Sequence, residues 1–140
     1  EVRPGNSWNE PHEAATEVIT RGLVDLGILK GRLRKLIDAE AYRPYYMHKT
    51  GHWLGMDVHD VGDYKLGDEW RVFEPGMVTT VEPGLYLADT IKDLPQQWWN
   101  IGIRIEDDVL VTETGNEVLT AGAPKTIADI ETQMNERGGA

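Results

Sequence analysis

Residues 77–87, MVTTVEPGLYL, decide the fold of this chain. The run divides into two strand-like pieces that meet at Glu82-Pro83-Gly84. Because the residue before a proline is held in extended backbone, Pro83 fixes the direction of the Glu82 carboxylate. Gly84 then permits a turn or a close approach. Apolar residues on both sides of Glu82 indicate a buried segment, in which a carboxylate needs a partner. The alternative is a surface glutamate at the edge of a turn.

Residues 101–112 predict one long strand with two different faces. Alternation puts Gly102, Arg104 and Glu106 on one face and the isoleucines at 101, 103 and 105 on the other, which we expect to be buried. Two interpretations of Arg104 stay open. It forms an ion pair on a solvated face, or it is a buried arginine that holds site carboxylates.

Three of the four histidines lie within the segment 48–60, HKTGHWLGMDVHD. A single histidine here is more often an ordinary hydrogen-bonded imidazole, but the clustering favours a site. His52 with Glu82 and Glu106 provides most of a ligand set for a divalent metal. A zinc helix of the His-Glu-x-x-His kind is excluded, since Lys49 stands where its glutamate would be.

Helices are predicted at both ends of the chain. Ser7 and Glu10 form a capping box, and Gly27 ends the helix that follows. The apolar residues that we expect on the buried face of this helix are Ala15, Val18, Ile19, Leu23 and Leu26. A short helix is predicted over 32–39, broken at Arg43-Pro44, and a last helix from Thr126 to about 135, after which 138–140 fray.

Loops and a hairpin are predicted between these helices. Residues 89–100 form a surface loop that carries Trp98 and Trp99, which we expect to pack on the sheet. Residues 112–116 form a turn, and 117–120 return as a hairpin strand.

The composition is that of an acidic domain of 140 residues with a net charge of −10. Such a chain is one domain or part of one, and nucleic acid and anionic membrane are poor partners for it. Because cysteine is absent, disulfides, zinc–thiolate sites and a thiol nucleophile are excluded, which fits a reducing compartment. No apolar run is long enough to cross a bilayer, and the start does not resemble a signal peptide.

Three segments, 48–62, 77–86 and 102–108, resemble the pita-bread metallopeptidases in order and in spacing. Within that family, residues 56–62, MDVHDVG, are most similar to the Xaa-Pro aminopeptidase (aminopeptidase P) branch, rather than to methionine aminopeptidase, creatinase or prolidase. The resemblance implies an α+β fold in which a curved antiparallel sheet is backed by helices. It also implies a cytoplasmic enzyme that hydrolyses peptides with proline at the second position and releases the residue before it.

The resemblance further implies a pair of divalent metal ions, manganese first, with cobalt or zinc as alternatives. It makes His52, Glu82 and Glu106 metal ligands, with Glu106 bridging the two ions. Glu82 would also take a proton from the attacking water and pass it to the leaving amine.

Further residues receive roles from the same resemblance. His48 and His59 would bind substrate and stabilise the tetrahedral intermediate, and Arg104 and Tyr86 would support the ligands. Lys49 replaces a glycine that is common in the family, which bears on substrate preference.

The family uses two more aspartate ligands and another substrate-binding histidine, which lie upstream of the helix near Ser7. We therefore expect residues 1–140 to be the C-terminal portion of a pita-bread catalytic domain, with an incomplete site, little activity alone and a tendency to form homo-oligomers. Two alternatives are a prolidase, which cleaves dipeptides, and a non-catalytic pita-bread binding module. The presence of all three expected ligands argues against the second.

Overall fold

The computed structural model of the chain describes residues 1–137, so the predicted fraying of 138–140 lies outside the described residues. The fold is α+β, as the sequence predicts. In chain order its elements are α1 (Glu10–Asp25), α2 (Leu33–Asp38), β1 (Lys65–Leu66), β2 (Glu69–Trp70), β3 (Val78–Val81), β4 (Gly84–Leu87), η1 (Gln96–Trp98), β5 (Ile101–Arg104), β6 (Asp107–Val111), β7 (Asn116–Val118) and α3 (Ile127–Arg137).

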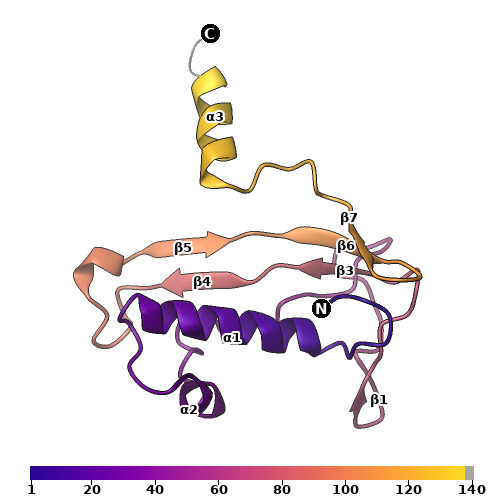
Figure 1. Cartoon of the computed structure of the whole chain (residues 1–140), viewed down its shortest axis with the longest axis horizontal. Helices are drawn as coiled ribbons and strands as arrows, with labels where there is room; N and C mark the ends of the chain where they lie inside the picture. The colour runs from indigo at the N-terminus through magenta and orange to yellow at the C-terminus, as the bar shows by residue number, and fades with distance from the viewer. Residues whose placement is uncertain (138–140) are drawn as a thin grey trace.

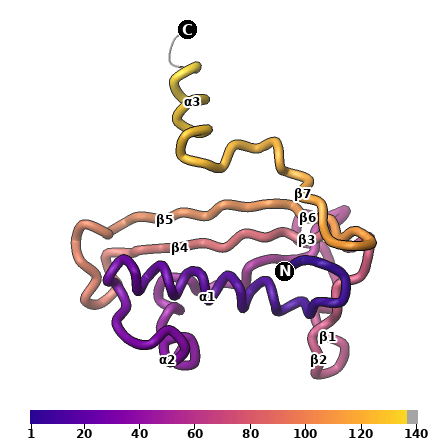
Figure 2. Tube along the Cα trace, viewed as in Figure 1, coloured from indigo at the N-terminus to yellow at the C-terminus, as the bar shows by residue number. Residues whose placement is uncertain are grey.

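Two long antiparallel arms form the frame of the molecule (Figure 1). One arm is β3 followed by β4, and the other is β5 followed by β6. β3 pairs with β6, β4 pairs with β5, and β7 returns beside β6. α1 lies along these arms, and the Cα trace follows the same arrangement (Figure 2). The predicted junction of two strands at Glu82-Pro83-Gly84 and the predicted hairpin after residue 112 are confirmed.

The prediction of one continuous strand over 101–112 is wrong. The second arm breaks after Arg104 and resumes at Asp107. The residues that face this gap are Glu82 and Pro83, which also lie outside the strands of the first arm. Proline has no N–H to donate to a ladder, and it forces an interruption that both arms share.

The ends of α1 follow from local hydrogen bonds. The Ser7 N–H donates to Glu10 Oε1 at 2.8 Å, so one half of the predicted capping box is present. The N-cap is Asn9 and not Ser7, because the helix begins at Glu10, and Ser7 Oγ accepts the Asn9 N–H at 3.3 Å, one residue before that start. At the other end Gly27 has φ +73°, and the Ile28 N–H reaches back to the Leu23 carbonyl at 2.9 Å. This is the left-handed helix end for which glycine is suited.

The predicted buried face of α1 is partly wrong. Leu23 is buried, but Val18 is 69% exposed and Leu26 is 47% exposed. Thr16 and Thr20 are buried in their place. The Thr20 hydroxyl donates to the Thr16 carbonyl at 2.7 Å, so its burial leaves that donor satisfied.

Two hydrophobic clusters lie at opposite ends of the arms, and Glu82 lies in the chain between Val81, which packs on one, and Leu85, which packs on the other. The cluster between α1 and β4 consists of Leu23, Tyr42, Tyr45, Tyr46, Leu87 and Leu94. The cluster between the first residues of the chain and β6 consists of Val2, Phe73, Val109 and Val111. Val81 packs on the second cluster and Leu85 on the first, so the strands on either side of Glu82 are anchored independently.

The isoleucine face of β5 is exposed, which contradicts the prediction that it is buried. Ile101, Ile103 and Ile105 are 37%, 56% and 46% exposed. The loop before β5 contains η1, and its Trp98 packs on the α1–β4 cluster as expected, while Trp99 is 42% exposed.

The remaining helices are short or stand apart. α2 ends at Asp38, before the predicted break at Arg43-Pro44, and Glu40 has φ +50° just beyond it. α3 projects away from the arms (Figure 1), and the Asp129 N–H donates to Thr126 Oγ1 at 3.1 Å, which confirms the predicted cap.

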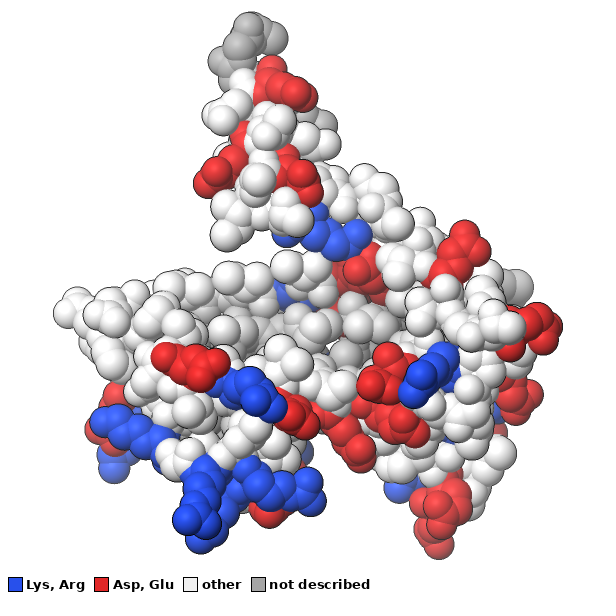
Figure 3. All heavy atoms as spheres, in the orientation of Figure 1, with Lys and Arg blue, Asp and Glu red and all other residues white. Residues whose placement is uncertain are grey.

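Basic side chains gather over α2 and acidic ones over α3 (Figure 3). No helix in residues 1–137 combines the length and the apolarity that a membrane span needs.

Candidate metal centre

Three side chains converge where the two arms lose their pairing. His52, Glu82 and Glu106 each offer one donor atom, and these atoms lie within 4.8 Å of one another. The His52 and Glu82 side chains are each 14% exposed, whereas Glu106 is exposed. One imidazole nitrogen with two carboxylate oxygens suits manganese, zinc or a similar divalent cation. The structure thus brings together the three residues that the sequence analysis assigns as metal ligands.

The hydrogen bonds of His52 determine which of its nitrogens faces the carboxylates. Its Nδ1 lies 2.9 Å from the Trp53 carbonyl oxygen, which can only accept, so Nδ1 carries the proton. In the neutral ring, Nε2 then presents its lone pair to Glu82 Oε1 at 3.1 Å. Two acceptors at this distance require a cation between them, either a proton or a metal ion.

Buried threonines hold His52 and Glu82 in place. The Thr80 hydroxyl donates to Glu82 Oε1 at 3.1 Å, and the Thr80 hydroxyl oxygen accepts the His52 N–H at 3.1 Å. Thr79 Oγ1 donates to the His52 carbonyl at 3.0 Å. The Glu82 N–H donates to the Thr50 carbonyl at 2.6 Å. Thr50, Thr79 and Thr80 are almost fully buried, so this network holds His52 and Glu82 from the interior of the protein.

Sequence reasoning missed these threonines as site residues. Thr79 and Thr80 lie between Val78 and Val81 in a strand, where threonine is an ordinary residue. The signal that could have found them is two adjacent hydroxyls in an otherwise apolar strand. Neighbouring residues of a strand point to opposite faces of the sheet, so one of the two hydroxyls must lie on the buried face.

His48 and Arg104 meet at Tyr86. His48 Nδ1 donates to the Lys49 carbonyl at 2.7 Å, so its Nε2 accepts from the Tyr86 hydroxyl at 3.0 Å. Interaction with Tyr86 and then with Glu82 raises the pKa of the Arg104 guanidinium. Arg104 Nε lies 3.6 Å from Glu82 Oε2, and the Arg104 side chain is 52% exposed, so the arginine is not buried, although the carboxylate that it contacts is a predicted ligand.

Glycines opposite and beside Tyr86 make room for its ring. Gly102 pairs with Tyr86 across β4 and β5, and a Cβ on Gly84 would lie 2.5 Å from the Tyr86 hydroxyl oxygen. The Tyr86 ring therefore occupies the space beside Gly84 and Gly102, and its hydroxyl reaches His48 from β4.

His59 reaches the centre from a loop. Its ring centroid lies 4.1 Å from that of His52, and its side chain is exposed. Residues 48–52, which carry His48 and His52, form neither helix nor strand.

His12 was not singled out in the sequence, yet it contacts the ligand-bearing segment from α1. Its Nδ1 lies 3.0 Å from Thr50 Oγ1 and 3.3 Å from the Tyr46 hydroxyl, and these two hydroxyls also contact each other. Burial, with Lys49 as the next cause, lowers the pKa of His12 to about 4. A neutral imidazole thus ties α1 to the segment that carries His48 and His52.

This fold and this donor set are those of a metal-dependent peptidase. The model of metallopeptidase family M24 matches residues 1–113, and the chain belongs to that family. It is 55% identical over 132 residues to a Xaa-Pro aminopeptidase of Haemophilus influenzae and 53% identical to that of Escherichia coli. Each alignment covers 94% of this chain and 30% of the relative.

Solved structures agree in fold. Aminopeptidase PepP of Pseudomonas aeruginosa superposes with a TM-score of 0.96 at 57% identity, over 99% of this chain and 31% of that one. Aminopeptidase P of Escherichia coli with the inhibitor Pro-Leu gives 0.89 at 52% identity, over 96% and 30%. The predicted pita-bread fold is confirmed. The chain spans about a third of the length of the relatives that it matches.

Proposed function

We propose that this chain is part of a Xaa-Pro aminopeptidase, in which His52, Glu82 and Glu106 bind divalent cations, manganese first. The observation that carries the proposal is the distance of 3.1 Å between His52 Nε2 and Glu82 Oε1, with Glu106 completing a three-donor group. The names of the most similar relatives support this function over the prolidase alternative. The cytoplasm is the proposed location.

The donor set fits a divalent cation because a nitrogen and two carboxylate oxygens are already gathered, and because His52 Nδ1 is held by a carbonyl. A cation bound there supplies Lewis-acid polarisation of the scissile carbonyl and lowers the pKa of water. Three donors are fewer than the five that the family resemblance implies. We therefore propose that further ligands complete the centre and that these 140 residues alone turn over substrate slowly.

The chain's own residues divide the remaining work. Glu82 accepts the proton of the attacking water and delivers it to the leaving amine, and Arg104 keeps that carboxylate oriented. His48 and His59 bind the substrate beside His52, and His48 does so once the substrate replaces the Tyr86 hydroxyl at its Nε2. Before that, Tyr86 orients the His48 ring by donating to the same nitrogen.

We also propose that the chain self-associates. The exposed isoleucines of β5 form an apolar strip, and such strips favour contact with another surface. A single monomeric species by light scattering at high protein concentration would count against this part of the proposal.

Manganese binding and hydrolysis test the function together. Calorimetric titration with MnCl₂ should show binding that weakens at least about tenfold in His52→Ala and Glu106→Gln. Glu117→Gln is the matched control, since it removes an exposed carboxylate from β7. Hydrolysis is then followed on a tripeptide with proline second and on its counterpart with alanine second.

Equal manganese affinity in the wild type and both ligand variants would refute the metal centre. Cleavage of the alanine peptide as fast as of the proline peptide would refute the proposed substrate class. Rapid cleavage of the proline peptide by this chain, lost in His52→Ala, would mean that another copy supplies the remaining ligands.

A further inference from the structure

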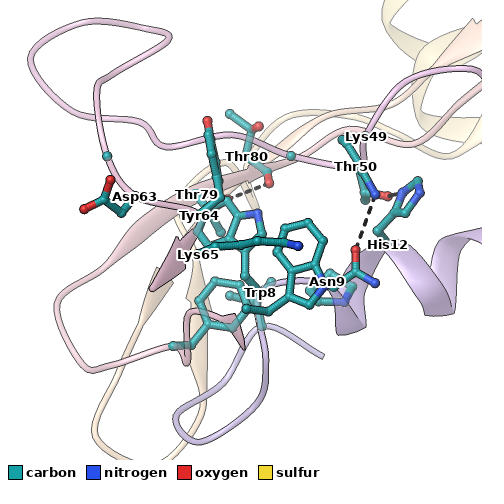
Figure 4. Close-up of a pocket in the computed structure, with 16 residues that line it drawn as sticks. Trp8, Asn9, His12, Lys49, Thr50, Asp63, Tyr64, Lys65, Thr79 and Thr80 are labelled. Atoms are coloured by element: carbon teal, nitrogen blue, oxygen red, sulfur yellow. Dashed lines mark hydrogen bonds between the residues drawn. The ribbon is translucent and has the colours of Figure 1, made fainter. Parts of the chain in front are cut away.

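A cavity lies beside Thr79 and Thr80, which hold the metal ligands in place. Its volume is about 620 Å³, and its walls include the aromatic side chains of Trp8, Tyr64, Trp70 and Phe73. Thr79 and Thr80 line it too, so it lies directly against β3, the strand that precedes Glu82 (Figure 4). Cavities of this size and apolar character are those in which proteins bind small molecules.

The aromatic rings form a connected wall rather than scattered contacts. The Trp8 ring centroid lies 5.1 Å from that of Tyr64 and 5.1 Å from that of Phe73. Phe73 is 2% exposed, so this wall is anchored in the core. An apolar ligand would therefore meet a surface that is already ordered.

The ammonium groups of Lys49 and Lys65 both lie over the ring of Trp70. Lys65 Nζ lies 4.5 Å and Lys49 Nζ 5.4 Å from the centroid of Trp70. Lys65 and Trp70 are paired across β1 and β2, which fixes their relative position. Lys49 donates to Asn9 Oδ1 at 3.4 Å, a contact drawn in Figure 4. Within residues 1–137 neither lysine has a carboxylate at ion-pair distance.

These unpaired cations are unexpected in a chain with 24 acidic and 14 basic residues. Asp63 also lines the cavity, on the opposite side of the close-up from Lys49, with Lys65 between them (Figure 4). Burial lowers the pKa of Lys49, with Arg43 as the next cause, and the carboxylates of Glu13 and Glu40 offset this only in part. An anion between the two lysines would stabilise the charged ammonium further.

We propose that this cavity binds a carboxylate carried on an apolar body of amino-acid or dipeptide size. The carboxylate lies between Lys49 and Lys65 above Trp70, and the apolar body packs on Trp8 and Phe73. The carboxyl-terminal end of a peptide and a free apolar acid share this chemistry. Binding needs no metal ion, so the proposal stands apart from the metal centre.

The test compares N-acetyl-L-phenylalanine with its neutral amide, in EDTA, by tryptophan fluorescence and calorimetry on the 140-residue chain. The acid should bind at least about tenfold more tightly than the amide at low salt, and added NaCl should reduce that preference. Lys49→Met with Lys65→Met should reduce the affinity for the acid to that for the amide and leave the amide unchanged. Lys30→Met with Lys92→Met is the matched control and should bind like the wild type.

Trp8→Leu separates the two parts of the site, because Trp8 contacts the apolar body and not the carboxylate, so this variant should weaken the acid and the amide alike. Equal affinity for acid and amide in the wild type would overturn the proposal. So would full acid binding in the Lys49 and Lys65 double variant, with circular dichroism showing that it is folded.

The source of the carboxylate is identified by competition with a tripeptide that has proline second and phenylalanine last. Displacement of N-acetyl-L-phenylalanine that strengthens when MnCl₂ replaces EDTA assigns the cavity to the carboxyl end of a peptide that also reaches the metal centre. Displacement that is indifferent to manganese assigns it to a free acid. Failure of the tripeptide to displace the probe in either buffer would overturn the shared-carboxylate chemistry.

Discussion

Glu82 and Glu106 occupy the first of the two register positions at which the arms stop pairing within residues 78–111. The β3–β6 ladder ends at Val81 opposite Asp107, and the β4–β5 ladder begins at Gly84 opposite Arg104. The β3–β6 register, extended one step into the gap, places Glu82 opposite Glu106. Opposite residues of an antiparallel pair point to the same face, so the fold holds two carboxylates side by side. Like charges in such a position repel unless a cation lies between them.

Replacing Glu106 by glutamine should therefore separate stability from metal binding. In EDTA, Glu106→Gln removes the repulsion and should raise the free energy of unfolding by roughly 0.5 kcal/mol. With about 1 mM MnCl₂, the wild type should gain stability and the variant should gain little, because a ligand is lost. Urea denaturation of the wild type and of Glu106→Gln, each in EDTA and in MnCl₂, measures the four free energies of unfolding. Glu117→Gln is the control. If Glu106→Gln destabilises the chain in EDTA, the repulsion argument is wrong.

The sequence alone predicts much of this frame because its signals are local. Pro83 after Glu82 predicts the junction of β3 and β4, and Gly27 predicts the end of α1. The break between Arg104 and Asp107 was missed because its cause is not local. It comes from a proline on the opposite arm, which becomes a neighbour only through the register.

The same distinction applies to the site. His52, Glu82 and Glu106 were predicted from motifs, whereas Thr50, Thr80 and His12 were not. These three act through contacts with residues distant in the chain: His12 reaches Thr50, and Thr80 Oγ1 accepts the His52 N–H. The exposure of the β5 isoleucines was also mispredicted, since alternation indicates which residues share a face but not whether another element covers it.

Thr80→Val tests the polar support of the ligands. It leaves the His52 N–H without its acceptor and Glu82 Oε1 without its donor, so it should cost about 1–3 kcal/mol of stability and weaken manganese binding about tenfold. Thr16→Val is the matched control, because Thr16 Oγ1 is buried with no hydrogen-bond partner among the described protein atoms. That variant should be neutral or stabilising. Equal losses in both would attribute the effect to packing alone.

His12 should make stability depend on pH. Its pKa is about 4 in the folded chain against 6.5 for an ordinary histidine, so below pH 6.5 the unfolded chain takes up a proton that the folded chain refuses. Stability from this group is complete above pH 6.5 and falls as the pH drops towards 4, by roughly 1–2 kcal/mol once partial exposure is allowed for.

His12→Gln should therefore flatten the decline of stability between pH 6.5 and 4, because the amide keeps hydrogen-bonding groups for Thr50 and Tyr46 but cannot titrate. His59→Gln removes an exposed histidine and should keep the wild-type slope. The measurement is the urea midpoint at half-unit steps of pH. Parallel curves for wild type and His12→Gln would contradict the burial argument.

Two glycine-to-alanine variants test how closely the ligand segment approaches β3. A Cβ on Gly51 would lie 2.0 Å from the Thr80 carbonyl oxygen, so Gly51→Ala must push apart two backbones. His52 and Thr80 exchange hydrogen bonds across this contact, and the shift should cost about 2–3 kcal/mol and weaken manganese binding as well. Gly22 lies inside α1, and a Cβ added there would have no neighbouring heavy atom within 4 Å, so Gly22→Ala should stabilise by about 0.5–1 kcal/mol. Urea denaturation should thus move the two midpoints in opposite directions, and a tolerated Gly51→Ala would mean that the ligand segment is not held against β3.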